Sequence, residues 1–194
     1  MKNFGYDRNN AAQDYEMLPK GGYVVKILNV KFEEGKDGKS DRLKLQVDIA
    51  EGDYAGYYKK QYESDTREDK KYRGIFEIWC PRNDGTEQDG WTKKTFDTCF
   101  AAIEDSNPGF RFNGTDEKTL VGKIVGAIIY EEQYRKDGDI KTARKFYKNL
   151  VDVDKVRKGT FKTPKDKLLK ENSGSTTSDG FMSIPTGESD ELPF

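Results

Sequence analysis

Residues 42–49 carry the clearest alternation of apolar and polar side chains in the chain. Four apolar residues occupy every second position: Leu43, Leu45, Val47 and Ile49. Because successive side chains of a strand point to opposite faces, this period predicts a strand with one buried face and one solvated face. The preceding run, residues 23–32, is rich in β-branched and aromatic residues, and a loop with Asp37-Gly38 separates the two runs. We therefore expect a β-hairpin here.

The sequence predicts four further elements after the hairpin: a third strand at 57–62, a helix at 92–104, a fourth strand at 120–130 and a fifth strand at 140–153. Residues 64–90 form an irregular excursion with a candidate short strand at 75–79. Thr92 is the expected N-cap of the helix. Its apolar residues recur at helical spacing: Phe96, Cys99, Phe100 and Ile103. A second Gly-containing loop, 136–139, joins the last two strands.

This order of elements matches an OB-fold, a five-stranded, partly open barrel, here with one helix between strands 3 and 4. The two loops that contain Asp-Gly then join strands 1 and 2 and strands 4 and 5, where they flank the ligand groove of that fold. We therefore expect a mainly β protein built as an OB-fold barrel. An SH3-like barrel or an irregular sandwich would fit the same short strands.

Basic and acidic residues are segregated along the chain. All 34 Lys and Arg residues lie within residues 1–170, together with 30 of the 35 Asp and Glu residues. The net charge is therefore +4 over residues 1–170 and −5 over residues 171–194, and it reaches +8 over residues 135–170. A basic stretch followed by an acidic tail is typical of a polyanion-binding protein with a separate interaction arm.

Composition divides the chain into four parts. We expect a lead-in at 1–20, the barrel at 21–158, a basic-to-polar flexible linker at 159–187 and an acidic docking tip at 188–194. Residues 173–178 contain only Ser, Gly and Thr, a composition typical of flexible linkers. We therefore expect the C-terminal tail to be disordered.

Two clusters interleave aromatic rings with cations. Single-stranded nucleic acids are bound by such sets, because cations contact the phosphates and rings stack on the bases. The expected DNA-binding residues are Arg42, Lys44, Tyr57, Tyr58, Lys59, Lys60, Tyr62, Arg135, Lys136, Arg144, Lys145, Phe146, Tyr147 and Lys148. Strand alternation would place Phe146 and Tyr147 on opposite faces, so one of these rings is expected in the core. Trp79 is expected in the core and Trp91 at the helix start, although either indole is large enough to stack on a base.

No motif points to catalysis. The chain has no His, Cys80 and Cys99 lack metal-ligand spacing, and the glycines mark turns and not phosphate-binding loops. Carboxylates are abundant, but none shows a spacing typical of a two-metal site. No run approaches the roughly 18 apolar residues of a membrane helix, and the N-terminus lacks a signal-peptide core. We expect a cytoplasmic, non-enzymatic protein with no metal, no cofactor and no membrane contact.

The chain ends in a short acidic run closed by an apolar tripeptide, Asp190-Glu191-Leu192-Pro193-Phe194. This pattern resembles the C-terminal tip of bacterial and phage single-stranded DNA-binding proteins, in which acidic residues precede a final Pro-Phe. The run of several Asp usual there is reduced here to Asp190-Glu191. The resemblance implies that the tip recruits replication and repair proteins while an OB-fold domain holds the DNA. Phe194 would fill a pocket, and the carboxylates would meet its basic rim.

Residues 18–164 also resemble proteins of Gram-positive phages and integrative elements that are assigned to single-stranded DNA binding. The resemblance rests on three segments: Gly56-Tyr57-Tyr58-Lys59-Lys60-Gln61-Tyr62, Thr66-Arg67-Glu68-Asp69-Lys70-Lys71 and Leu120-Val121-Gly122-Lys123. It implies a phage or mobile-element protein that acts in a bacterial host cell.

These features predict a protein that binds single-stranded DNA largely without sequence preference, during replication, recombination or repair. The rival hypothesis is an interaction adaptor whose barrel binds protein and whose tip recruits a host enzyme. The oligomeric state (a homo-oligomer included), the number of nucleotides bound and the preference for DNA over RNA stay open at this point.

Overall fold

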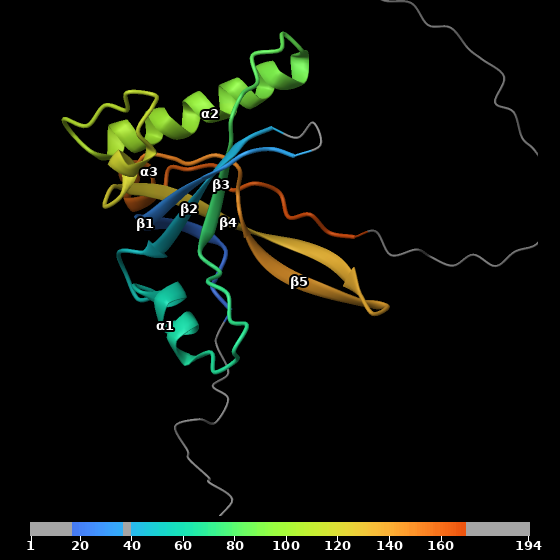
Figure 1. The fold of residues 1–194 in the computed structure, drawn as a ribbon. Helices are drawn as coiled ribbons and strands as arrows, with labels where there is room; N and C mark the ends of the chain where they lie inside the picture. Colours follow the sequence, from blue (N-terminus) through green and yellow to red (C-terminus); the bar gives the residue numbers. More distant parts are fainter. Residues whose placement is uncertain (1–16, 37–39, 170–194) are drawn as a thin grey trace, which may run out of the picture.

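One antiparallel sheet of five strands forms the centre of the structure, a computed structural model that describes residues 17–36 and 40–169 (Figure 1). The strands lie in the order β3-β2-β1-β4-β5, so β1 is the central strand. Their bounds are β1 Gly21–Glu33, β2 Arg42–Ile49, β3 Ile75–Trp79, β4 Ile124–Lys136 and β5 Asp139–Phe146. The helices are α1 Tyr57–Ser64, α2 Glu87–Ser106, the 3-10 helix η2 Glu117–Leu120 and α3 Val153–Arg157. A mainly β fold is therefore confirmed.

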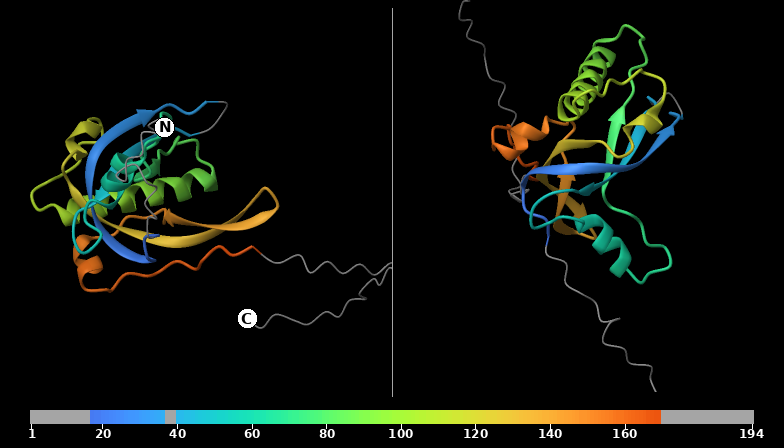
Figure 2. Two further views of the ribbon diagram at one scale, coloured as in Figure 1. Left: turned by 90° about the horizontal axis from the view of Figure 1, so that it is seen from below. Right: turned by 90° about the vertical axis from the view of Figure 1, so that its left-hand side faces the viewer.

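The β1–β2 hairpin confirms the alternation in the sequence. Leu43, Leu45 and Val47 are buried, whereas the residues between them are half-buried. β1 pairs with β2 along one edge and with β4 along the other, and its register shifts between Ile27 and Asn29. Such a bulge bends a strand and increases its twist, and Figure 2 shows β1 curving strongly across the molecule.

The predicted third strand at 57–62 is wrong, because these residues belong to α1. Gly56, with a φ of 74°, turns the chain into the helix. The buried carboxylate of Asp48 then accepts hydrogen bonds from the backbone amides of Tyr58 (2.9 Å) and Lys59 (3.2 Å) in the first turn. Amides of a first turn lack partners within the helix, and a carboxylate there also matches the helix dipole. The cap comes from β2, so no local pattern reveals it.

The third strand of the sheet is β3, which the sequence placed as a candidate within an irregular excursion. It pairs with β2 and buries Phe76 and Ile78. The expectation that Trp79 lies in the core is wrong: its exposed fraction is 43%. Because side chains alternate along a strand, Trp79 lies on the face opposite to Phe76 and Ile78. A helix between the third and fourth strands is confirmed, and it is α2.

α2 begins at Glu87, earlier than the predicted start at Thr92. The N-cap is Thr86, whose Oγ1 accepts a hydrogen bond from the amide of Asp89 (3.2 Å). Thr92 lies inside the helix, and its hydroxyl donates to a backbone carbonyl one turn earlier (3.1 Å). Gly90 lowers the helix propensity of the first turns, which explains the late predicted start. The apolar face is confirmed, with Phe96 half-buried and three residues buried: Cys99, Phe100 and Ile103.

β4 and β5 also differ from their predicted bounds. β4 begins at Ile124, because the residues before it include η2, which buries Leu120. β5 ends at Phe146, and the end of the predicted fifth strand leads into α3. The N-cap of α3 is Asp152, whose carboxylate accepts a hydrogen bond from an amide of the first turn (3.1 Å). The helix that begins at Val153 ends the extended backbone that the predicted strand would need.

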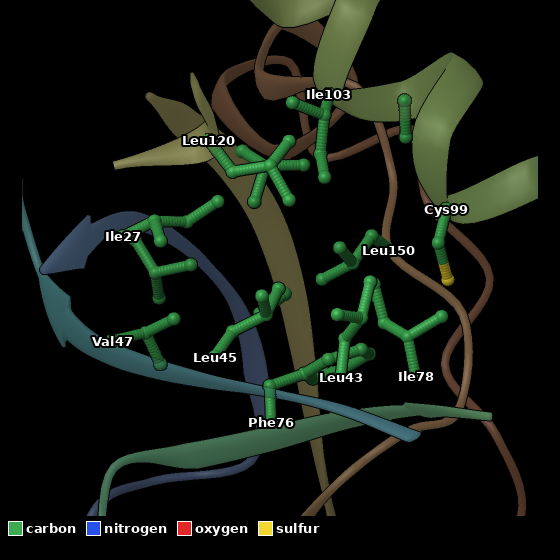
Figure 3. Close-up of a cluster of buried hydrophobic side chains, with 14 of the residues drawn as sticks. Ile27, Leu43, Leu45, Val47, Phe76, Ile78, Cys99, Ile103, Leu120 and Leu150 are labelled. Atoms are coloured by element: carbon green, nitrogen blue, oxygen red, sulfur yellow. The ribbon is translucent and has the colours of Figure 1, made fainter. Parts of the chain in front are cut away.

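The core lies between the curved sheet and α2. Figure 3 shows Cys99 and Ile103 of α2 pointing towards side chains of the strands. The labelled residues of this buried cluster are Ile27, Leu43, Leu45, Val47, Phe76, Ile78, Cys99, Ile103, Leu120 and Leu150. The packing explains why α2 covers one end of the sheet and leaves its first turns beyond the core.

The last described residues lie beside β4. Lys167 forms a parallel bridge with Glu132, its amide donates to the carbonyl of Glu131 (3.0 Å), and its carbonyl accepts from the amide of Gln133 (2.8 Å). The sequence placed residues 159–169 in a linker, whereas the structure joins their C-terminal part to the sheet. The remaining linker residues and the tip lie outside the described residues, as does most of the lead-in.

No helix within residues 17–36 and 40–169 is both long enough and apolar enough to cross a membrane.

Candidate nucleic-acid interface

Both edge strands of the sheet, β3 and β5, line a groove with a volume of about 1930 Å³. Its walls also include α1 with the segment after it, the first turns of α2, part of β4 and the segment 164–167. Figure 1 shows β3 running between α2 and α1, with the β4–β5 hairpin extending to one side. The groove therefore collects side chains from elements far apart in the sequence.

Cations outnumber carboxylates along the groove. Eight cations line it: Arg67, Arg73, Arg82, Arg144, Lys145, Lys148, Lys165 and Lys167. Two carboxylates line it: Asp65 and Glu77. A cleft lined mainly by one sign of charge raises the local concentration of ligands of the opposite sign. The groove therefore favours an anion that is extended along it.

Ion pairs occupy four of the eight cations: Arg67 with Asp65, Arg82 with Asp84, Arg144 with Glu131, and Lys167 with Glu132. The hydrogen bonds from Arg67 hold the pKa of Asp65 far below its usual range. The other four are Arg73, Lys145, Lys148 and Lys165, for which the described part of the chain supplies no ion pair. These four cations can bind an external anion without first breaking an ion pair within the described part of the chain.

Nine aromatic residues line the groove: Tyr57, Tyr58, Phe76, Trp79, Trp91, Tyr130, Tyr134, Phe146 and Tyr147. Only three of these nine are exposed, with exposed fractions of 43% for Trp79, 61% for Trp91 and 42% for Tyr134. A base can stack only on a ring face that it can reach. The three rings that a base can reach belong to three elements: Trp79 to β3, Trp91 to α2 and Tyr134 to β4.

A cation lies over each of the two indoles. The Arg42 guanidinium is 5.4 Å from the centroid of the Trp79 ring, and the Lys94 ammonium is 5.6 Å from that of Trp91. Such contacts orient an aromatic ring. Because much of both indoles stays exposed, each presents an oriented surface to the groove.

Seven predicted site residues line the groove: Tyr57, Tyr58, Arg144, Lys145, Phe146, Tyr147 and Lys148. Three rings of this region pack on one another, with centroids 5.8 Å apart for Tyr58 and Phe146 and 5.9 Å apart for Phe146 and Phe76. Phe146 is therefore the ring of its pair that packs on the core, and Tyr147 lies edge-on to Tyr130 (6.4 Å). These rings form the floor of the groove.

Arg144 is bound within the protein. Its guanidinium pairs with Glu131, and its Nε donates to the backbone carbonyl of Leu18 (3.1 Å). These contacts join β5 to β4 and to the segment before β1. Arg144 therefore builds the wall of the groove, whereas the next residue, Lys145, is exposed.

Seven predicted site residues lie outside the lining of the groove: Arg42, Lys44, Lys59, Lys60, Tyr62, Arg135 and Lys136. Arg42 and Lys44 bind Glu33 at 2.6 and 2.8 Å. Hydrogen bonds from Lys44 and then Arg42 lower the pKa of Glu33 to about 2. Lys59, Lys60 and Tyr62 of α1 are exposed. Arg135 and Lys136 lie near the tip of the β4–β5 hairpin. None of these seven residues therefore lines the groove, although the Arg42 guanidinium contacts the ring of Trp79, which does.

A chain of tyrosines underlies one side of the groove. Edge-to-face contacts join Tyr23 to Tyr54, Tyr54 to Tyr57 and Tyr57 to Tyr58, with centroids 5.2–6.4 Å apart. Burial raises the pKa of Tyr58 well above its usual range and that of Tyr23 to about 12. The phenols of Tyr23 and Tyr58 therefore stay neutral at physiological pH and do not repel an anion.

The expected site did not include Trp79, Tyr134, Arg73 or Lys165, all of which line the groove. A signal was present for Trp79, because strand period places it on the face opposite to its buried neighbours. No local signal distinguishes Arg73 or Lys165 from other surface cations, since only the fold brings them to one groove. Among the described residues, no group of three or more Cys, Asp or Glu could hold a metal ion.

Comparison of the chain with models of protein families and with curated proteins finds no match.

Proposed function

We propose that this protein binds single-stranded DNA, largely without sequence preference, in the groove lined by β3 and β5. One observation carries the proposal: a single groove combines three exposed aromatic rings with four cations that have no ion pair within residues 17–36 and 40–169. Cations release counterions from the phosphates, and rings stack on the bases. Stacking tolerates any sequence because every base has a π face.

Single strands suit this groove better than duplexes. Trp79, Trp91 and Tyr134 can stack only on bases whose faces are free. In a duplex the bases are stacked on one another, so only contacts to phosphates would remain. We therefore expect the affinity for a single strand to exceed that for a duplex of equal length.

An OB-fold barrel is the architecture that we propose for the sheet. The strand order β3-β2-β1-β4-β5 with α2 between β3 and β4 is compatible with it. Phe76 of β3 and Phe146 of β5 are 5.9 Å apart, so the two edge strands approach each other through their side chains. The groove would then run along the seam of a partly open barrel.

The tip, Asp190 to Phe194, would recruit a replication or repair protein. This part of the proposal rests on the sequence alone: an aromatic residue behind carboxylates fits a pocket with a basic rim. Deletion of the tip and Phe194→Ala should each abolish capture of that partner and leave the fold unchanged. A pull-down from bacterial lysate with the three proteins measures this, and an identical set of captured proteins would contradict it.

Tryptophan fluorescence tests the DNA-binding proposal directly. The chain has two Trp residues, and both line the groove. Titration with oligo(dT) should quench their emission, and Trp79→Phe and Trp91→Phe should each remove part of the quenching. Replacing either indole by Ala should weaken binding by about 1–3 kcal/mol. Tyr62→Ala, a ring outside the groove, is the matched control.

An absence of both quenching and a mobility shift with oligo(dT) would contradict this function. The adaptor hypothesis would then gain weight from the edge of β3. The hydrogen bonds Val47 N to Gly74 O and Cys80 N to Asp41 O flank β3, and they fix which backbone groups of β3 point towards β2. By alternation, the backbone groups of Glu77 and Trp79 face the groove, where an extended peptide could pair with them.

A further inference from the structure

We infer that the segment 163–169 is a detachable wall of the groove whose docking on β4 is linked to nucleic-acid binding. This inference rests on the proposed function, and it adds a binding element and a linkage that the function alone does not include. The core does not need the segment, because no residue of 163–169 belongs to the buried cluster. Its attachment therefore depends on a small set of polar contacts.

Asp166 is the central anchor of the segment. Its carboxylate accepts a hydrogen bond from the Glu131 amide of β4 (3.1 Å) and pairs with the Lys20 ammonium (2.6 Å). The main-chain bonds of Lys167 with β4 and a bond from the Leu169 amide to the Gln133 side chain (3.1 Å) complete the attachment. The Lys20–Asp166 bond is exposed, the bonds Glu131–Asp166 and Leu169–Gln133 are only partly buried, and so few contacts make docking only modestly stable.

Docking adds charge to the groove. Lys165 and Lys167 both line it, and the Lys167 ammonium lies 5.6 Å from the Tyr130 ring. Lys165 is one of the four groove cations without an ion pair in the described part of the chain. An undocked segment would take it away, and a bound strand that contacts Lys165 would hold the segment in place. Docking of the segment must therefore favour DNA binding by the same free energy by which DNA binding favours docking.

The direction in which Asp166→Ala changes the affinity for DNA distinguishes this inference from simple electrostatics. Asp166→Ala removes a negative charge, which by charge alone strengthens the binding of a polyanion. If docking matters, Asp166→Ala instead removes one phosphate contact. The slope of log K against log[salt] then becomes less negative by about 0.7, which corresponds to about fivefold weaker binding at ~0.1 M salt. Asp154→Ala, the same change on the surface of α3, should leave binding equal or slightly tighter.

Full-length wild type, Asp166→Ala, Asp154→Ala and Lys165→Gln should be titrated with fluorescein-labelled oligo(dT). Exchange of the Gln133 amide, which donates to Lys167, reports docking by NMR. Oligo(dT) should slow this exchange about fivefold in wild type and leave it unchanged in Lys165→Gln. Equal affinities of Asp166→Ala and Asp154→Ala, or an exchange rate that DNA does not change, would overturn the inference. Wild type that fails to bind oligo(dT) would overturn the proposed function as well.

Discussion

Arg144 and Lys145 are neighbours on β5 and both line the groove, but their surroundings give them different roles. The Lys145 side chain is exposed and has no ion pair among the described residues. The Arg144 guanidinium is bound to Glu131, and the side chains of this pair are each 22% exposed. We expect Lys145→Gln to weaken DNA binding and Arg144→Gln to weaken the fold.

The magnitudes follow from the number of groove cations that have no ion pair in the part of the chain that the structure describes. Four such cations give a slope of log K against log[salt] of about −2.8, at about −0.7 for each phosphate neutralised. Lys145→Gln should reduce the slope to about −2.1 and weaken binding about fivefold at ~0.1 M salt. Arg144→Gln should keep the slope near −2.8. It should lower the free energy of unfolding by about 1–3 kcal/mol, because Glu131 then loses a charged hydrogen-bond partner.

Fluorescence anisotropy with labelled oligo(dT) at several NaCl concentrations gives the slopes, and urea denaturation gives the stabilities. The two variants carry the same change of charge one residue apart, so each is the control for the other. Equal losses of slope in both variants would refute the distinction between paired and unpaired cations. A flat salt response of the wild type would refute the electrostatic role of the groove altogether.

Three further predictions concern the fold. Asp48→Ala should lower the free energy of unfolding in urea by about 2–4 kcal/mol, because first-turn amides of α1 lose a charged acceptor; unchanged stability would contradict the cap. The pKa of Glu33 is lowered to about 2 from 4.5, by Lys44 first. Its stabilising contribution is therefore present above pH 4.5 and lost as the pH falls towards 2, and Glu33→Gln should flatten that part of the urea-midpoint profile. Gly74→Ala should cost about 1–3 kcal/mol in the same assay, since a Cβ would lie 2.8 Å from the Tyr58 ring, and an equally stable variant would be evidence against this packing.

Local patterns predicted the elements whose signals lie within a few residues. The alternation at 43–49 and the Asp-Gly loop before it are properties of adjacent residues, and the β1–β2 hairpin follows them. The apolar face of α2 was also visible, because Cys99, Phe100 and Ile103 recur at helical spacing. The hydrophobic period decides these cases, since one face of each element must be buried.

Long-range contacts decided the elements that the sequence misassigned. Residues 57–64 have the aromatic composition of a strand, but a carboxylate on β2 caps them as α1. The third strand instead forms at 75–79, where pairing with β2 buries Phe76 and Ile78. Local propensity is a weak preference, and such tertiary contacts override it.

The candidate site divides in the same way. The amino-acid sequence by itself determined that the protein carries many cations and rings, that its basic stretch lies at 135–170, and that its end is acidic. Only the tertiary structure decided which of these cations and rings share a groove, and which are bound to other residues of the protein. Arg42 and Arg144 are held by carboxylates, and Tyr58 and Phe146 pack on the core, whereas Lys145 and Trp79 stay accessible. The reason is physical: the availability of a charge or a ring depends on its neighbours in space, and folding chooses those neighbours to satisfy burial and charge across the whole chain.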